Sequence, residues 1–218
     1  MLGVVFPLAL VVGLSPLPIL PVLLLLTTPR ARANGWAYLG AWLVTLSVVV
    51  SAALLLAQLS DPAPASEEGL GWVQVVTGAV CLVMAAVKVM RRPRADEPKE
   101  TPRWMAATAT YTPGQAARLG AVLAGANPKN LAMAIAAGAE IAVIAERPSQ
   151  TVAGLLGFVL VGSIGVATPV LVQSALGERA TAPLERGRAW LVRHSTALSV
   201  GVLGVLGVAL LLKGLSIV

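Results

Sequence analysis

The sequence is poor in charged residues and in cysteine. Charged residues make up 12% of the 218 positions, against about 25% in an ordinary soluble domain. The single cysteine, Cys81, excludes an intrachain disulfide, and we expect a small buried apolar residue there. We find no His, Cys, Asp and Glu cluster with metal-ligand spacing, no phosphate-binding Gly-Lys-Ser/Thr loop and no Ser, His and acid set. These absences argue against an enzyme, a bound metal and a cofactor.

Apolar residues, by contrast, are abundant and lie in long runs. Hydrophobic residues make up 57% of the chain, and each run is close to the roughly 20 residues needed to cross a bilayer core of about 30 Å. The runs cover residues 3–26, 36–59, 70–90, 117–144, 151–175 and 196–216. We therefore predict an all-α membrane protein with six transmembrane helices and no separate soluble domain.

The net charge of +6 is explained by membrane topology rather than by nucleic acid. Lys and Arg concentrate in the segments 30–32, 88–118 and 179–193, whereas the loops after the second and fourth runs are mostly acidic. With six spans the three basic segments fall on one side, which the positive-inside rule makes cytoplasmic. We expect a multi-pass plasma-membrane protein with both termini outside and no nucleic-acid partner.

Six spans divide into two halves. The predicted organisation is a first three-helix repeat over 1–90, a basic cytoplasmic linker over 91–113 and a second three-helix repeat over 114–218. Because each half has an odd number of spans, the second half is inverted relative to the first, and such repeats usually meet at a site near the membrane midplane. Thr112 and Gln115 fit a capping box at the start of the fourth span.

One seven-residue pattern occurs in each half. The stretches from Gly13 to Ile19 and from Gly125 to Leu131 both read Gly, apolar, Ser or Asn, Pro, any residue, Pro or Asn, aliphatic. A proline inside a helix removes a backbone donor and clashes with the preceding turn. Within hydrocarbon, the freed backbone groups are tolerated only where protein or a hydrated cavity covers them. We expect broken helices in the first and fourth spans that face each other across a transporter-type site.

Lys129 is the cation deepest in an apolar run. It lies about 16 Å of helix rise beyond Arg118, close to the bilayer centre, where a lysine costs about 2.5–3.5 kcal/mol on insertion scales. Snorkelling over that length is implausible, and Glu140 is too far along the same helix to pair with it. Asn127 and Asn130 flank Lys129 and have three candidate roles: binding an anion, coordinating an ion, or satisfying the broken backbone.

The other candidate site residues are less distinctive. Ser15, Pro16 and Pro18 in the first copy, with Pro128 in the second, are predicted to shape the substrate site because the Ser/Asn-Pro break recurs. Two roles fit Glu140 equally well, a proton-coupling carboxylate and a residue at the outer rim.

Several further features have structural interpretations. The five tryptophans lie near span ends or in loops and are predicted to anchor at the membrane interface. Glycines of the fifth and sixth runs, among them Gly201, Gly204 and Gly207, are predicted to allow close helix packing. A short interfacial helix is expected over 183–193, and a position near the interface explains Gln74 without a ligand.

Two motifs resemble those of a known family: Leu14-Ser15-Pro16-Leu17-Pro18-Ile19 and Ala126-Asn127-Pro128-Lys129-Asn130-Leu131. The family is the Gap/Sap-like family of actinobacteria, the glycolipid- and sulfolipid-addressing membrane proteins, a branch of the lysine-exporter superfamily. The resemblance covers the whole chain in span count and spacing. It implies a six-helix inverted-repeat fold and a role in moving cell-envelope glycolipids or their precursors to the surface. Amino-acid exporters of the same superfamily have similar motifs, so the resemblance constrains the fold more than the substrate.

The predicted function is a secondary transporter or flippase that exports an anionic envelope glycolipid or its precursor. Lys129 neutralises the anionic group, and Asn127, Asn130 and Ser15 orient it. One alternative is an amino-acid or small-solute exporter of the lysine-exporter type. Another is a non-transporting membrane scaffold that docks lipid-synthesis or export machinery through 91–113. The expected partners are the bilayer and a lipid or anionic small molecule, with a second copy of the chain or lipid-synthesis and export proteins as candidate protein partners.

Overall fold

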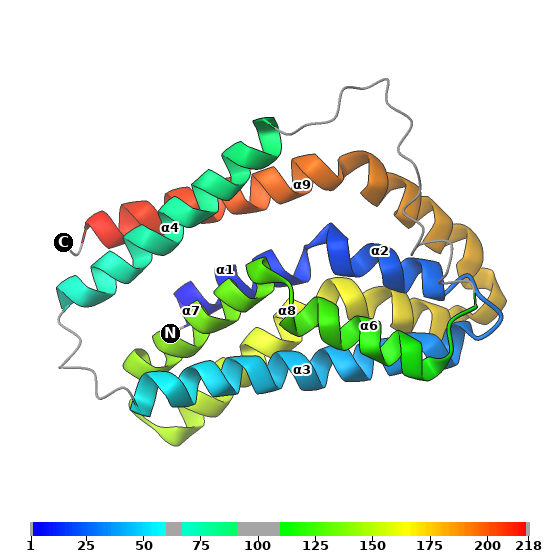
Figure 1. Cartoon of the computed structure of the whole chain (residues 1–218), viewed down its shortest axis with the longest axis horizontal. Helices are drawn as coiled ribbons and strands as arrows, with labels where there is room; N and C mark the ends of the chain where they lie inside the picture. Colours follow the sequence, from blue (N-terminus) through cyan, green and yellow to red (C-terminus); the bar gives the residue numbers. More distant parts are fainter. Residues whose placement is uncertain (1, 60–66, 91–109, 217–218) are drawn as a thin grey trace.

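A computed structural model describes residues 2–59, 67–90 and 110–216, and all regular secondary structure in these ranges is helical (Figure 1). The elements are α1 (Leu2–Gly13), α2 (Pro16–Leu25), α3 (Ala31–Leu59), α4 (Glu67–Met90), α6 (Pro113–Gly125), α7 (Pro128–Ile144), α8 (Pro148–Leu176), the 3-10 helix η2 (Gly177–Ala180) and α9 (Thr181–Leu215). The all-helical prediction is confirmed for these ranges. Most of the linker predicted over 91–113 lies outside them.

Helix length and hydropathy indicate a membrane protein. Ala31–Leu59 and the continuous helical stretch Pro148–Leu215 are long and apolar enough to cross a membrane, and the bent pair Val5–Gly13 and Pro16–Leu25 is a third candidate if it counts as one span. Gln74–Met90 is apolar but shorter. By this measure the described residues contain two or three spans, against the six predicted. The stretch Pro148–Leu215 turns back on itself at η2, so that α8 and α9 run in opposite directions (Figure 1).

Both predicted helix breaks are present. α1 ends at Gly13 and α2 begins at Pro16, with a bend of 44° between them. α6 ends at Gly125 and α7 begins at Pro128. Each proline thus starts the second half-helix, where its missing N–H would have had no helical partner. The broken first and fourth helices therefore follow directly from the two motif copies.

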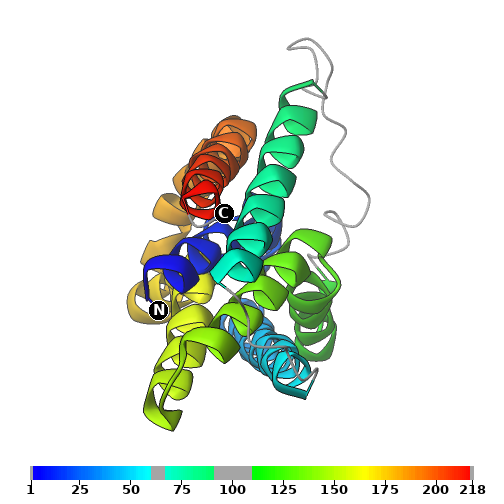
Figure 2. The same ribbon diagram turned by 90° about the vertical axis from the view of Figure 1, so that its left-hand side faces the viewer.

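The helices pack as a bundle and an outer pair. The bundle contains α1, α2, α3, α6, α7 and α8, and the outer pair is α4 with α9 (Figures 1 and 2). Within the bundle α3 lies along α6 and α7, while α1 lies along α8 and α7. α4 packs extensively only against α9, and α9 reaches the bundle through α2 and α1. The helices of the two sequence halves are consequently interleaved rather than packed as separate bodies.

The glycine that opens each motif copy lies at a close helix contact. A Cβ added to Gly13 would lie 2.5 Å from the carbonyl oxygen of Val161 in α8. A Cβ added to Gly125 would lie 2.8 Å from the Cγ2 atom of Thr45 in α3. Real Cβ atoms do not approach other atoms this closely. The contact at Gly13 is with backbone, so the observed packing requires glycine there, whereas the Thr45 side chain would have to shift to admit a Cβ at Gly125. Each break thus packs against a long helix, the first against α8 and the second against α3.

The outer pair also depends on small residues. A Cβ on Gly78 of α4 would lie 2.8 Å from the carbonyl oxygen of Gly207 in α9, which confirms the close packing predicted at Gly207. Gly201 and Gly204 have nothing within 4 Å of an added Cβ, so the packing role predicted for these two is wrong. They lie on a face of α9 that α4 does not cover.

The start of the fourth span is as predicted, whereas the interfacial helix is not. Thr112 caps α6 in a complete capping box with Gln115. Residues 183–193 do not form a separate short helix, because α9 runs unbroken from Thr181 to Leu215. Pro183 lies in its first turn, where proline is tolerated, and no later proline interrupts the helix.

Trp42 corrects the interpretation of the tryptophans. Its side chain is completely buried in the bundle, and its indole Nε1 donates a hydrogen bond to Ser163 Oγ at 3.1 Å. Trp36, Trp72 and Trp190 are exposed, as interfacial anchors require. Distance along the sequence from a span end does not reveal which face of the helix a residue occupies, and Trp42 is on the inner face of α3.

The remaining observations on single residues agree with the sequence. Cys81 is a free, fully buried thiol on α4, as expected of a small apolar residue. The fifth tryptophan, Trp104, lies outside the described ranges.

Candidate functional site

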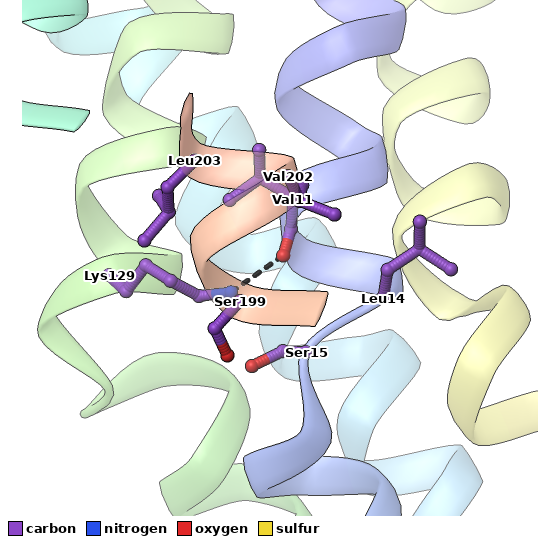
Figure 3. A pocket seen from close by; sticks show the side chains of 7 residues that line it. All are labelled: Val11, Leu14, Ser15, Lys129, Ser199, Val202 and Leu203. Atoms are coloured by element: carbon purple, nitrogen blue, oxygen red, sulfur yellow. Dashed lines mark hydrogen bonds between the residues drawn. The ribbon is translucent and has the colours of Figure 1, made fainter. Parts of the chain in front are cut away.

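The candidate site lies at the break between α1 and α2, where α7 and α9 approach it (Figure 3). The lining residues come from these elements and are Val11, Leu14, Ser15, Lys129, Ser199, Val202 and Leu203. They enclose a cavity of about 10 Å³, which is room for about one water molecule. The site in this conformation is therefore closed around a water-sized space.

Lys129 reaches across the site to the end of α1. Its Nζ donates a hydrogen bond of 2.6 Å to the carbonyl oxygen of Val11 (Figure 3). That carbonyl has lost its usual helical donor, because the backbone N–H of Ser15 instead donates to Val12 in a tightened last turn. The C-terminal end of a helix also carries a partial negative charge. The ammonium thus neither snorkels nor pairs with Glu140, and it satisfies the helix end that the first motif exposes.

The two asparagines satisfy the second break. Asn127 is the N-cap of α7, and its Oδ1 accepts a hydrogen bond of 3.1 Å from the backbone N–H of Lys129. The fully buried Asn130 donates through Nδ2 to the carbonyl of Leu123, near the end of α6, at 3.0 Å. Of the three roles predicted for these residues, satisfying the broken backbone is the one observed. Asn130 Oδ1 is buried without a partner among the described residues.

The side chain of Ser15 does not cap its helix, whereas that of its counterpart Asn127 does. It occupies the N-cap position of α2 but makes no side-chain capping hydrogen bond. Its side chain is 5% exposed, and its hydroxyl points toward that of Ser199 beside the end of Lys129 (Figure 3). Ser199 was not among the residues expected from the sequence, where the only signal is a small polar residue within the apolar sixth run.

The prolines position the site without lining it. Pro16 and Pro18 are buried in the first turn of α2 and together remove two of the backbone donors at that helix start. The carbonyl of Pro18 accepts a hydrogen bond of 2.8 Å from the fully buried Tyr38 hydroxyl of α3. Pro128 is exposed at the start of α7. Of the predicted site residues, the structure brings Ser15 and Lys129 together in the cavity, while the prolines and asparagines build the two breaks around it.

Comparison with known protein families places the chain. Residues 5–216 match the model of a family described as Sap, sulfolipid-1-addressing protein. The chain belongs to this family. Its description implies a membrane-associated role in sulfolipid addressing, and the resemblance carried by the two motifs is thereby confirmed at family level. No curated protein and no solved structure gave a match.

A second polar group in this Sap-family protein lies away from the cavity. Glu140 of α7 is only 3% exposed, so its side chain faces the protein interior, although it lies near the end of α7. Its Oε1 accepts a hydrogen bond of 3.0 Å from Nε2 of Gln74 in α4, which is itself 4% exposed. Gln74 thus hydrogen bonds inside the protein. Both side chains are buried because α4 approaches α7 at this point. Hydropathy along the sequence does not predict which helices approach each other.

Proposed function

We propose that this Sap-family protein is a secondary exporter or flippase that moves an anionic envelope glycolipid, or its precursor, across the plasma membrane without a catalytic step or a cofactor. The observation that carries this proposal is the position of Lys129. Its ammonium is held inside a broken-helix site, and its hydrogen-bonded partner is the neutral carbonyl of Val11.

The carbonyl of Val11 accepts a hydrogen bond from the ammonium but carries no net charge to neutralise it. A phosphate, sulfate or carboxylate supplies an acceptor and an opposite charge together. An anionic headgroup can therefore displace Val11 from Lys129, while the hydroxyls of Ser15 and Ser199 supply further donors beside it (Figure 3). The family description names a sulfolipid, and a sulfate or sulfonate group is an anion of this kind. The site must open to admit it, because the present cavity holds about one water.

The packing supports two inverted repeats. The second span of each half, α3 or α8, lies along the broken helix of the other half, and the third spans, α4 and α9, pair with each other. Gly13 approaches α8 as Gly125 approaches α3. Exchanging the two halves thus preserves these pairings, as an inverted repeat of the lysine-exporter type requires, although the contacts of α9 with α1 and α2 have no equally extensive counterpart at α4. Since the halves are interleaved, we infer that access alternates by movement of the outer pair against the bundle.

The distribution of basic residues supports the proposed orientation. The end of α2, the starts of α3, α6 and α9 and the end of α8 gather at one end of the molecule, whereas α1 begins and α9 ends at the other (Figure 1). Arg30, Arg118 and Arg179 lie at these helix ends or within two turns of them. By the positive-inside rule this end faces the cytoplasm and both termini face outward.

The small-solute alternative receives less support. A cationic or zwitterionic amino acid needs an acidic group close to where it binds, and the described lining of the cavity contains none. Glu140 instead hydrogen bonds to Gln74 outside this lining. The scaffold alternative depends on the segment 91–113, most of which lies outside the described ranges.

The test is the surface display of envelope lipids in cells that lack the native gene product and express variants. Lys129→Ala is expected to reduce the surface fraction of the transported lipid to the level of cells without the protein, with the lipid accumulating inside. Lys213→Ala removes an exposed lysine in the last turn of α9 and serves as the matched control. Full display by Lys129→Ala, at equal protein abundance in the membrane, would contradict the proposal.

A further inference from the structure

A buried polar pair between α4 and α7 retains unused hydrogen-bonding capacity. Gln74 and Glu140 share one hydrogen bond, from Gln74 Nε2 to Glu140 Oε1 at 3.0 Å, and both side chains are nearly inaccessible to solvent. The other oxygen of each group, Gln74 Oε1 and Glu140 Oε2, is buried and lacks a partner among the described residues. The pair therefore presents two uncompensated oxygens in the interior.

A negative charge on this carboxyl would be poorly compensated. An ionised carboxylate away from water needs a cation or several hydrogen bonds, and here a single neutral amide donates to it. A proton on Glu140 removes the charge and turns the carboxyl into a donor. Because a glutamine amide offers both donors and an acceptor, rotation of the Gln74 amide lets it accept from the protonated acid or donate to the ionised one. The pair can thus hold both protonation states.

The pair also connects the two packing units. α4 packs extensively only against α9, whereas α7 belongs to the bundle, so the bond from Gln74 to Glu140 is a polar link between the outer pair and the bundle. Separation of α4 from α7 would expose the carboxyl to water and allow its proton to leave. Protonation and the docking of α4 are therefore linked.

We propose that Glu140 and Gln74 form a proton-binding site that couples proton movement to the displacement of the outer pair. The coupling rests on the proposed transport function, whereas proton binding does not. A proton needs only the two oxygens present, while a hard metal cation requires a larger shell of oxygen ligands. The site lies about 16 Å along α7 from Lys129, towards the proposed outer face, and is thus separate from the headgroup site.

The neighbouring helices carry several other ionisable groups, and none of them is the hydrogen-bonded partner of Glu140. Among the elements that pack on α7, α1 and α8 carry no ionisable side chain in the described ranges, α3 carries Arg32 and Tyr38 near its start, and α6 carries Arg118. α7 itself carries Lys129. α4, which reaches the site through Gln74, carries Glu67, Glu68, Cys81 and Lys88. Its partner α9 carries Lys213 near its end, and its first half carries Glu185, Arg186, Arg188, Arg193 and His194. The hydrogen-bonded partner of Glu140 is an amide rather than any of these groups.

The test is the thermal unfolding of the purified full chain in lipid nanodiscs from about pH 5.5 to about pH 8. Unfolding exposes Glu140 to water, where an ordinary glutamate is ionised above about pH 4.3. The wild-type unfolding constant should therefore rise with pH, by up to about tenfold per pH unit. Glu140→Gln should remove this component, and Glu146→Gln, the same change at an exposed position, should retain it. An equal pH response in wild type and Glu140→Gln would overturn the proposal.

Two further experiments test whether sodium binds instead of a proton and whether Glu140 is protonated in the wild type. Replacing Na⁺ by choline should leave the wild-type midpoint unchanged, and a midpoint raised by Na⁺ and independent of pH would overturn the proton assignment. If Glu140→Gln does not fold, carbodiimide labelling of the wild type, mapped by mass spectrometry, should modify Glu140 more at low pH, and equal labelling across the range would overturn the site. Neither readout uses a transported lipid. Inactivity of the transporter and absence of the proton site are therefore separate results.

Discussion

Replacing Lys129 by methionine separates a functional cation from a structural cap. The variant keeps an unbranched apolar side chain but removes the ammonium and its 2.6 Å hydrogen bond to Val11. Loss of a hydrogen bond to a charged group costs about 1.5–3 kcal/mol. Methionine also avoids the cost of placing a lysine at the centre of the membrane, which is about 2.5–3.5 kcal/mol on insertion scales. The two contributions oppose each other and nearly cancel, so we expect the free energy of unfolding to change by about 1 kcal/mol or less.

The assay combines stability with transport. A change of 1 kcal/mol corresponds to about 2–4 °C in the midpoint of thermal unfolding for a chain of this size, and tryptophan fluorescence of the purified protein measures it. Surface display of the envelope lipid, measured in the same strain series, should fall to the background of cells without the protein. Stability is thus nearly retained while transport is lost, because a neutral side chain cannot pair with an anionic headgroup.

Two results would refute this reasoning. If Lys129→Met destabilised the protein by about 3 kcal/mol or more and lipid display fell only in proportion to folded protein, the lysine would serve as a cap for α1. If display were unchanged, the headgroup would not use this cation. Lys213→Met, at an exposed position of α9, should change neither quantity.

Two further predictions concern the construction of the breaks. Asn130→Ala leaves a carbonyl of α6 without its donor and should lower the free energy of unfolding by about 1–3 kcal/mol, measured by thermal unfolding in nanodiscs; a change within error would mean that water replaces the side chain. Gly13→Val places carbon atoms against the backbone of α8 and should prevent accumulation of folded protein in the membrane, whereas Gly201→Val, at an open position, should accumulate normally. Equal accumulation of the two valine variants would contradict the close contact at the first break.

The features that the sequence predicts well are those that depend on local geometry. Pro16 and Pro128 must begin new half-helices because a proline interrupts the preceding helix, and both do so. The capping box at Thr112 needs only residues within one turn. The depth of Lys129 in its run follows from counting residues. In each case the determining neighbours lie within a few positions along the chain.

The partners of these residues could not be predicted, because they come from other helices. The acceptor for Lys129 is Val11, whose carbonyl is available only because the last turn of α1 tightens. Trp42 and Glu140 turn inward through the rotational phase of α3 and α7 in the bundle, although both lie close to the ends of apolar runs. Hydropathy gives the depth of a residue in the membrane, but the face it occupies depends on which helices pack around it.

The two motif copies have different polar residues because side chains of the second copy, on α7, satisfy carbonyls at both breaks. A broken helix exposes carbonyls at the end of its first half, and each break here has one such carbonyl satisfied by a side chain of the second copy. Asn130 bonds to Leu123 within its own half, and Lys129 bonds to Val11 in the other half. The first copy, in which Leu14 precedes Ser15 and Pro16 and Pro18 follow it, contributes no cap. Displacement of α7 from α1 would therefore free the Lys129 ammonium and the end of α1 together. An anionic headgroup that enters between them neutralises the ammonium, and the Ser15 hydroxyl is free to donate a hydrogen bond to that headgroup.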